Sequence, residues 1–303
     1  MLILNPQHYY LIQQPWWGIL IALYLFLGGL GGMAYCVSYY FWRKGGDEKL
    51  VTYGSLLGLV AVIVGSIFLV FDLGHPERFY LVFVSPKLNT KSWIFIGSTL
   101  LSTFMLFDAI FLAPRIFKWI PWSKDGSVAR VSGLIAFLAG IGVAAYTGVL
   151  IGVVYNIPFW NAPALPVVFM ISALSTGLAS LVLLMMFVNR EAKEIHVMAK
   201  TDGFVMIIEL IVLFLYLLIK SYGPVGAIES VKSILYGWLA PYFVGGVVLM
   251  GLAIPVMLIF GYEVKRPGVT AITAISSIFV LIGGALLRYV ILSAGLLQIP
   301  CCI

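Results

Sequence analysis

Residues 17–42 have the sequence WGILIALYLFLGGLGGMAYCVSYYFW, which contains no Asp, Glu, Lys or Arg. An α-helix rises about 1.5 Å per residue and the hydrocarbon core of a bilayer is about 30 Å thick, so about 20 apolar residues can cross it. This stretch is therefore predicted to be a transmembrane helix. It is far longer than the apolar part of a signal peptide and no small-residue cleavage site follows it, so we expect it to be retained.

The rest of the chain has the same character. Hydrophobic residues make up 62% of its 303 residues and charged residues 10%, with a mean hydropathy of +1.08, whereas a soluble domain has roughly 25% charged residues. The sequence thus predicts an all-α integral membrane protein with about eight transmembrane helices in a single polytopic membrane domain. The expected spans are 17–42, 52–73, 93–114, 131–154, 163–187, 203–222, 241–262 and 269–295.

Lys and Arg are concentrated in alternate connectors between the expected spans. The connectors after the first, third, fifth and seventh spans carry Arg43, Lys44, Lys49, Arg115, Lys118, Lys124, Arg130, Arg190, Lys193, Lys200, Lys265 and Arg266. Those after the second and sixth carry only Arg78, Lys87, Lys91, Lys220 and Lys232. Because cytoplasmic loops are enriched in Lys and Arg, we expect both chain termini on the outer side of the cell membrane. Since the cations are spread between the spans, the net charge of +6 does not indicate nucleic-acid binding.

Small residues recur within the expected spans and predict close helix packing. They include Gly28, Gly29, Gly31, Gly32, Gly245, Gly246, Gly283 and Gly284. Small side chains let two helix backbones approach closely in a membrane. The first run lies inside an apolar helix and follows no strand, so a dinucleotide-binding loop is not predicted.

Few ionisable side chains fall within the expected spans or at their edges, and each is a candidate functional residue because charge is costly in hydrocarbon. They are Asp72, Asp108, Glu209 and Arg288. Asp72 and Arg288 are expected near the outer ends of their spans, and Asp108 and Glu209 about two turns from the cytoplasmic ends. Two interpretations remain open: pairs that lock helices together, or a proton path formed by Asp108, Glu209 and Arg288.

The placement of histidine and cysteine argues against bound metal. His8, His75 and His196 all fall outside the expected spans, although membrane haem is commonly held by histidine. Cys36 is interpreted as a packing residue, and no group of Cys, His and carboxylate residues has the spacing of a metal site. We expect no haem and no metal in this chain, so electron transfer through it would need a bound organic carrier.

Polar and aromatic side chains gather at the predicted outer ends of the spans. They are Gln14, Trp17, Asp72, His75, Tyr146 and Thr147. A belt of aromatic residues at the membrane surface explains the tryptophan. It does not explain Asp72, His75 or Tyr146.

Several segments, in this order, resemble the NrfD/PsrC family of quinone-binding membrane subunits, of which polysulfide reductase is the best-known type. They are YLFLGGLGG (24–32), FDLGHPERF (71–79), SWIFIG (92–97), YTGVLIG (146–152), PFWNAPALP (158–166) and SALSTG (172–177). The resemblance implies two four-helix bundles, no haem, and a quinone site near the outer surface. It also implies an iron–sulfur partner subunit that exchanges electrons with a molybdenum or tungsten catalytic subunit.

The resemblance places the family tyrosine, implicated in quinone binding, at Tyr146, and the DLG-x-P turn at Asp72, Gly74 and Pro76. At the start of the first span, where the polysulfide reductase pattern has polar ligands that include a histidine, this chain has Gln14 and Trp17, with His8 further upstream.

A quinone requires an apolar cleft with one or two hydrogen-bonding groups, and its reduction requires protons. The expected cofactor is a quinone of the menaquinone type. The predicted quinone site comprises Gln14, Trp17, Asp72, His75, Tyr146 and Thr147. Among these residues Asp72, His75 and Tyr146 are expected to be catalytic.

The leading hypothesis is a membrane subunit that exchanges electrons between the quinone pool and an outer iron–sulfur subunit of a polysulfide or sulfur reductase-like molybdoenzyme, with possible proton translocation. Terminal catalysis would lie in a partner. The iron–sulfur subunit is expected to dock on the outer connectors 75–92 and 223–240, and membrane lipid surrounds the spans. The alternatives are a proton- or ion-translocating transporter bundle and a passive anchor of the complex.

Overall fold

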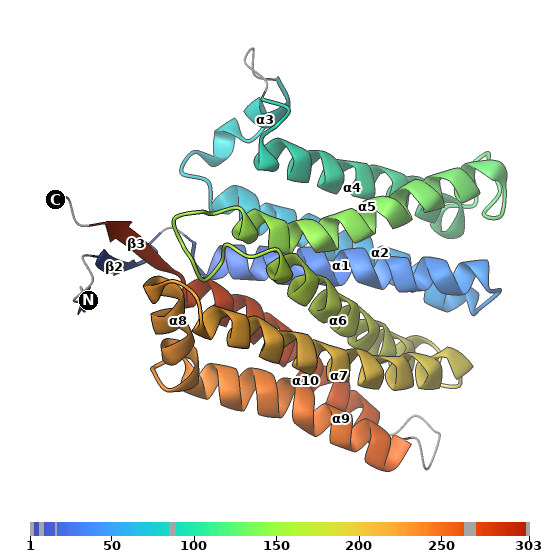
Figure 1. Cartoon of the computed structure of the whole chain (residues 1–303). Coiled ribbons are helices and arrows are strands. Elements are labelled where there is room, and N and C mark those ends of the chain that lie inside the picture. Colours follow the sequence, from blue (N-terminus) through green and yellow to red (C-terminus); the bar gives the residue numbers. More distant parts are fainter. Residues whose placement is uncertain (1–2, 6–8, 16, 85–88, 264–270, 301–303) are drawn as a thin grey trace.

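The structure is a computed structural model that describes residues 3–5, 9–15, 17–84, 89–263 and 271–300. Within these ranges, eight helices are long and apolar enough to cross a membrane. They run side by side, and both ends of the chain lie at the same end of the molecule (Figure 1). The predicted fold class, an all-α multi-pass membrane protein with eight spans, is confirmed.

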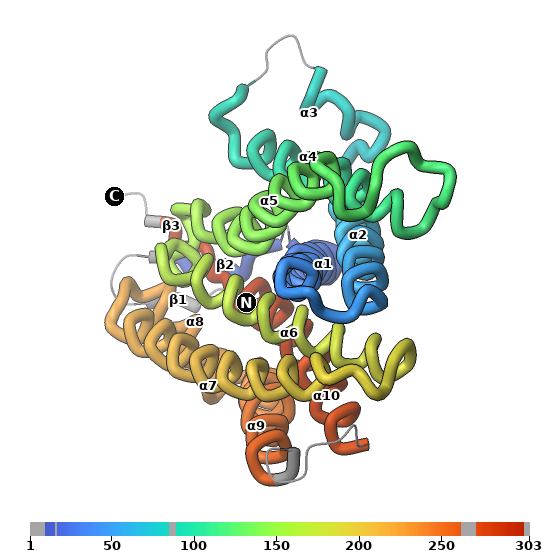
Figure 2. Tube along the Cα trace, turned by 90° about the vertical axis from the view of Figure 1, so that its right-hand side faces the viewer, coloured from blue at the N-terminus to red at the C-terminus, as the bar shows by residue number. Residues whose placement is uncertain are grey.

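The first four long helices form one bundle. They are α1 (Ile19–Arg43), α2 (Glu48–Phe71), α4 (Trp93–Ile116) and α5 (Ser127–Gly152). Each packs against two others, because α1 contacts α2 and α5, and α4 contacts the same two helices. These contacts close a ring of four helices, seen along their axes in Figure 2.

The other four spans form the second bundle. They are α6 (Ala164–Val188), α7 (Lys193–Ser221), a seventh crossing, and α10 (Ala271–Ser293). The seventh crossing consists of η2 (Pro241–Ala253), α9 (Ile254–Leu258) and η3 (Ile259–Glu263), the first and last with the wider turns of a π-helix. It contains Pro255, which lacks the N–H that a regular helix would use. Contacts of α6 with α1 and α5, and of α10 with α1, join the two bundles.

Glycine residues mark the closest helix contacts, as the small-residue pattern predicted. A Cβ added to Gly32 of α1 would lie 2.6 Å from the carbonyl oxygen of Gly140 in α5, and one added to Gly283 of α10 would lie 2.4 Å from the Cα of Gly251. Any larger side chain at these positions would push the helices apart. Gly245 has no neighbour within 4 Å, so the packing interpretation does not extend to it.

Helix α7 begins at Lys193, ten residues before the expected span at 203. The added segment buries Ile195, Met198, Ala199 and Asp202 on one face. This spacing follows the helical repeat, although the charges around it resemble those of a connector. His196 and Asp202 therefore belong to a long helix rather than to a loop.

Both chain ends form strands, which the sequence did not predict. Strands β1 (Ile3–Asn5), β2 (Tyr9–Gln13) and β3 (Leu296–Pro300) make an antiparallel sheet in the order β1-β2-β3, with Leu11 opposite Gln298. Beside the sheet lies the short helix α8 (Val225–Leu235), and η1 (Pro76–Arg78) and α3 (Leu81–Val84) lie at the same end of the bundles (Figure 1). We call this the terminal end, and the other the opposite end.

Candidate functional site

Tyr146 lies inside the first bundle, near the terminal end of α5. Its side chain is 5% exposed. The ring packs directly on Gly97 of α4, where a Cβ would overlap it. Its hydroxyl makes no hydrogen bond to the residues that the structure describes. The position is thus a buried phenol whose hydroxyl is left for another partner.

Tyr24 of α1 is a second buried phenol at similar depth, and the sequence analysis did not single it out. It is 0% exposed, and its hydroxyl has no hydrogen-bond partner within the described ranges. It interacts electrostatically with Tyr146. Its ring borders Gly28, which Val143 and Thr147 of α5 also approach. A signal was present, because Tyr24 lies five residues inside its helix and Tyr146 six, but 16 tyrosines in the chain obscured it.

Thr147 is fully buried next to Tyr146, but its hydroxyl already has a partner. Its Oγ1 donates a hydrogen bond to the carbonyl oxygen of Ala144, at 2.7 Å. Its methyl group faces Gly28 and its hydroxyl oxygen faces Gly29. The side chain therefore helps to pack α5 against α1.

Asp72 and His75 follow α2 at the terminal end. Asp72 ends the helix and is half-buried, and this burial raises the pKa of its carboxyl group. It lies seven residues beyond Gly65, which packs on the backbone of Tyr24, so it shares that face of α2 two turns closer to the terminal end. His75 is exposed, and its Nδ1 lies 3.0 Å from Oε1 of Glu77. The structure therefore directs Asp72 toward the tyrosines and leaves His75 at the surface.

Gln14 and Trp17 hold the start of α1 in place. The Gln14 side chain accepts a hydrogen bond from the Trp17 N–H at 2.9 Å and donates one to the Trp17 carbonyl oxygen at 2.8 Å. Trp17 stacks on Trp160 with ring centroids 5.3 Å apart, and Trp160 donates to the carbonyl oxygen of Ile291 in α10. These side chains join α1 to α10 and to the loop after α5. His8 and Trp16 lie outside the described residues.

A polar cluster lies inside the second bundle, around Arg288 of α10. The guanidinium is fully buried and donates to Oγ of Ser172 at 2.5 Å, and to the carbonyl oxygens of Gly284 and Phe169. Glu209 of α7 is also buried, within hydrogen-bond reach of Ser172 and in electrostatic contact with Arg288. The hydrogen bonds of Arg288 thus go to α6 and its own helix and not to Asp72.

The polar cluster extends along α7 in both directions. Toward the opposite end, Asp202 is buried and accepts a hydrogen bond from Ser175 at 2.6 Å. Toward the terminal end, Tyr216 donates to the carbonyl oxygen of Phe159, and Lys220 donates to those of Pro158 and Asn161. Asp202 and Lys220 are separated by about 27 Å of helix and lie on one face. We call Asp202, Glu209, Tyr216 and Lys220 the α7 stripe.

Asp108 lies apart from this stripe, in the first bundle. It is fully buried in α4 and accepts a hydrogen bond from Ser55 of α2. Its second oxygen, Oδ2, has no partner in the described part of the chain. Of the three residues predicted to form a proton path, the structure brings Glu209 and Arg288 together and places Asp108 in the other bundle.

No group of three or more His, Cys, Asp and Glu side chains that could hold a metal ion is found within the residues that the structure describes. The tyrosine pair fits a different kind of ligand. A buried hydroxyl without a partner costs roughly 1–3 kcal/mol. Two such groups at one depth therefore suit an organic molecule that carries acceptor oxygens.

Comparison with known proteins supports the family resemblance across the whole sequence. A polysulfide reductase membrane-family relative, from the polysulfide reductase of Wolinella succinogenes, is 29% identical over 92% of this chain and 94% of its own length. Protein NrfD of Escherichia coli is 29% identical over 93% of this chain and 96% of its own length. A subunit of the selenate reductase of Mesobacillus selenatarsenatis is 24% identical over 82% of this chain and 68% of its own length. Residues 4–300 match the family described as "Polysulphide reductase, NrfD", and the chain therefore belongs to the NrfD family.

Proposed function

We propose that this chain is the quinone-interacting membrane subunit of a reductase complex. The observation that carries the proposal is the pair of buried hydroxyls, Tyr24 and Tyr146, inside the first bundle of an NrfD-family chain. A bound quinone would supply a redox couple that takes up two electrons and two protons. Menaquinone is the type that we propose.

The residues of the pair can orient such a molecule. A phenol hydroxyl donates one hydrogen bond, so Tyr146 and Tyr24 can each donate to a carbonyl oxygen of the head group. The surrounding helices exclude water from this position. Asp72, whose pKa is raised by burial, lies two turns closer to the terminal end and can exchange a proton with water there. His75, which is exposed, is a weaker candidate for that step, and Gln14 and Trp17 support the site by fixing the start of α1.

The terminal end offers a docking surface for a redox partner. The proposed orientation, based on the distribution of Lys and Arg, places this end outside the cytoplasm. It carries the sheet, the loop that contains η1 and α3, and α8. We propose that an iron–sulfur subunit docks here and links this chain to a molybdenum or tungsten catalytic subunit.

Site-specific cross-linking tests the proposed docking surface. Tyr236, just after α8, is 86% exposed at the terminal end, and Trp119, between α4 and α5, is 78% exposed at the opposite end. A photo-cross-linking amino acid at position 236 should capture an iron–sulfur protein in native membranes, and one at position 119 should not. Capture of the redox partner only from position 119 would reverse the proposed orientation.

Proton translocation is a second candidate function, favoured by the α7 stripe. Its acidic residues face Arg288 and the serines of α6 in the interior of the second bundle, and its length is close to the thickness of a bilayer core. We propose that protons move along Asp202, Glu209 and Arg288. Asp108 would serve a separate branch in the first bundle.

Proton uptake during quinone turnover tests this role. In reconstituted vesicles, Glu209→Gln should slow proton uptake from the opposite side by about tenfold or more, because an amide cannot carry the proton. Asp202→Asn should act in the same way, and Asp108→Asn measures the contribution of the first bundle. Tyr216→Phe is the matched control, since its hydroxyl only donates to a loop carbonyl. Unchanged uptake in both acidic variants would assign these carboxyl groups to helix packing.

A further inference from the structure

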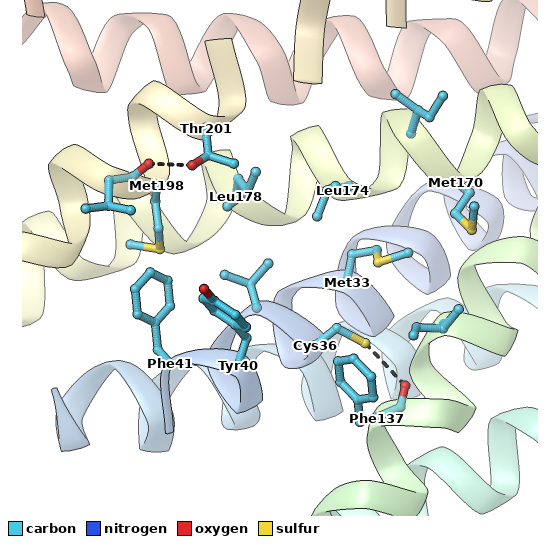
Figure 3. A pocket seen from close by; sticks show the side chains of 14 residues that line it. Met33, Cys36, Tyr40, Phe41, Phe137, Met170, Leu174, Leu178, Met198 and Thr201 are labelled. Atoms are coloured by element: carbon cyan, nitrogen blue, oxygen red, sulfur yellow. Dashed lines mark hydrogen bonds between the residues drawn. The ribbon is translucent and has the colours of Figure 1, made fainter. Parts of the chain in front are cut away.

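An apolar groove lies between the two bundles, on the side of the opposite end. Helices α5 and α6 meet near the terminal end, where Gly148 touches Pro166, and diverge toward the opposite end (Figure 1). The space between them forms a cavity of about 590 Å³. Figure 3 shows side chains of α1, α5, α6 and α7 that point into it, among them Met33, Phe137 and Leu174.

The groove opens to the surroundings of the protein. Tyr40 and Val197, which line it, are 54% and 51% exposed. Tyr40 lies three residues before the end of α1, and Val197 lies four residues after the start of α7. The open part of the groove therefore reaches the membrane leaflet at the opposite end.

The groove is distinct from the tyrosine pair. Met33, which lines the groove, follows Tyr24 by nine residues on α1, and Phe137 precedes Tyr146 by nine residues on α5. Nine residues correspond to two and a half helical turns, so each tyrosine lies on the face of its helix opposite the groove. A molecule held by the two hydroxyls cannot occupy both positions.

The walls offer hydrocarbon contacts and few polar groups. Cys36 Sγ already donates to the carbonyl oxygen of Phe137, and Oγ1 of Thr201 donates to that of Val197 at 2.8 Å. Only the hydroxyl of Tyr40, at the open rim, remains. Three methionines, Met33, Met170 and Met198, line the space, and their flexible thioethers adapt to an irregular chain. These walls suit an alkyl chain and cannot bind a quinone ring through its carbonyls.

Cations lie beyond the open rim on the helix faces that form the groove. Lys44 follows Tyr40 by four residues, and Arg130 precedes Phe137 by seven, which places both over the groove, one and two turns closer to the opposite end. Both side chains are exposed and have no ion-pair partner within the described ranges. The nearby Glu194 is engaged, because its Oε1 accepts from the Asp47 N–H at 3.0 Å.

We infer that this groove binds one acyl chain of an anionic phospholipid, with the phosphate held by Lys44 and Arg130. The apolar walls account for the chain and the two cations account for the charge of the head group. The lipid fills the space that the diverging helices leave, and it links the first bundle to the second.

Lipid retention in the purified complex tests the groove. After exchange into mixed phosphatidylglycerol and phosphatidylcholine, native mass spectrometry should show phosphatidylglycerol retained on this chain. Leu174→Trp fills the groove and should remove that adduct. Leu106→Trp is the matched control, because Leu106 is 58% exposed on the outer surface of α4, and it should keep the adduct. Retention unchanged by Leu174→Trp, or loss of a bound isoprenoid quinone instead of the phospholipid, overturns the assignment.

A pair of surface substitutions tests the head-group contacts without changing the packing. The double variant Lys44→Gln, Arg130→Gln should lower the preference for phosphatidylglycerol over phosphatidylcholine by about tenfold, since each cation near an anionic lipid contributes measurably to binding. The variant Lys49→Gln, Lys118→Gln removes the same charge from the same end, away from the groove, and should preserve the preference. An equal loss in both double variants would mean that only the overall charge attracts the lipid.

Discussion

Tyr146→Phe should lower quinone-dependent turnover by roughly 10- to 100-fold, because a hydrogen bond to developing negative charge on a quinone oxygen contributes more than an ordinary one. The free energy of unfolding should not fall. The ring keeps its contact with Gly97, and the lost hydroxyl has no protein partner within the described ranges. The measurement is turnover with a soluble quinol analogue, together with thermal unfolding of the purified complex.

Tyr24→Phe separates the two hydroxyls. Both variants should lose turnover if the phenols hold the same head group, whereas loss in Tyr146→Phe alone would limit the site to α5. A rise in KM indicates a positioning hydroxyl, and a fall in kcat indicates one that donates as charge develops.

Tyr216→Phe is the control for both tyrosine variants. Its hydroxyl has a partner, the carbonyl oxygen of Phe159 at 2.6 Å, so its removal should lower the free energy of unfolding by about 1 kcal/mol and leave quinone turnover intact. The opposite pattern at position 146, with normal turnover and reduced stability, would make Tyr146 a packing residue.

The sequence predicted the number of spans and the bundle class because hydrophobic length determines both. It could not predict the strands at the chain ends. Pairing of β2 with β3 joins residues such as Leu11 and Gln298 that are almost the whole chain apart, and strands this short carry little periodicity of their own. The start of α7 was misplaced because charged residues such as Lys193 and Lys200 resemble a loop, whereas the buried positions between them follow a helical repeat.

The candidate site was only partly predictable for a related reason. Depth can be counted along a helix, and it correctly selected Asp108, Glu209 and Arg288 as buried side chains. Which helix faces which cannot be counted in this way. Equal depth suggested a pairing of Asp72 with Arg288, whereas rotation of α10 directs the guanidinium toward Ser172 of α6. Tyr24 was missed for the converse reason, because its significance depends on the facing residue of α5.

Arg288→Met should lower the free energy of unfolding by about 3–5 kcal/mol, the largest effect expected of any single change here. The guanidinium is fully buried and holds Ser172 and two backbone carbonyls, and its loss leaves Glu209 without a counter-charge. Arg288→Lys keeps the charge but not the planar fork, so it should lose less. The double variant Arg288→Met, Glu209→Gln removes both charges and should recover a substantial part of the loss, which thermal unfolding of all four proteins measures as a coupling energy. If the double variant is as unstable as the sum of the two single variants, the two side chains do not interact, and the polar cluster is held by the hydrogen bonds of Arg288 to α6 alone.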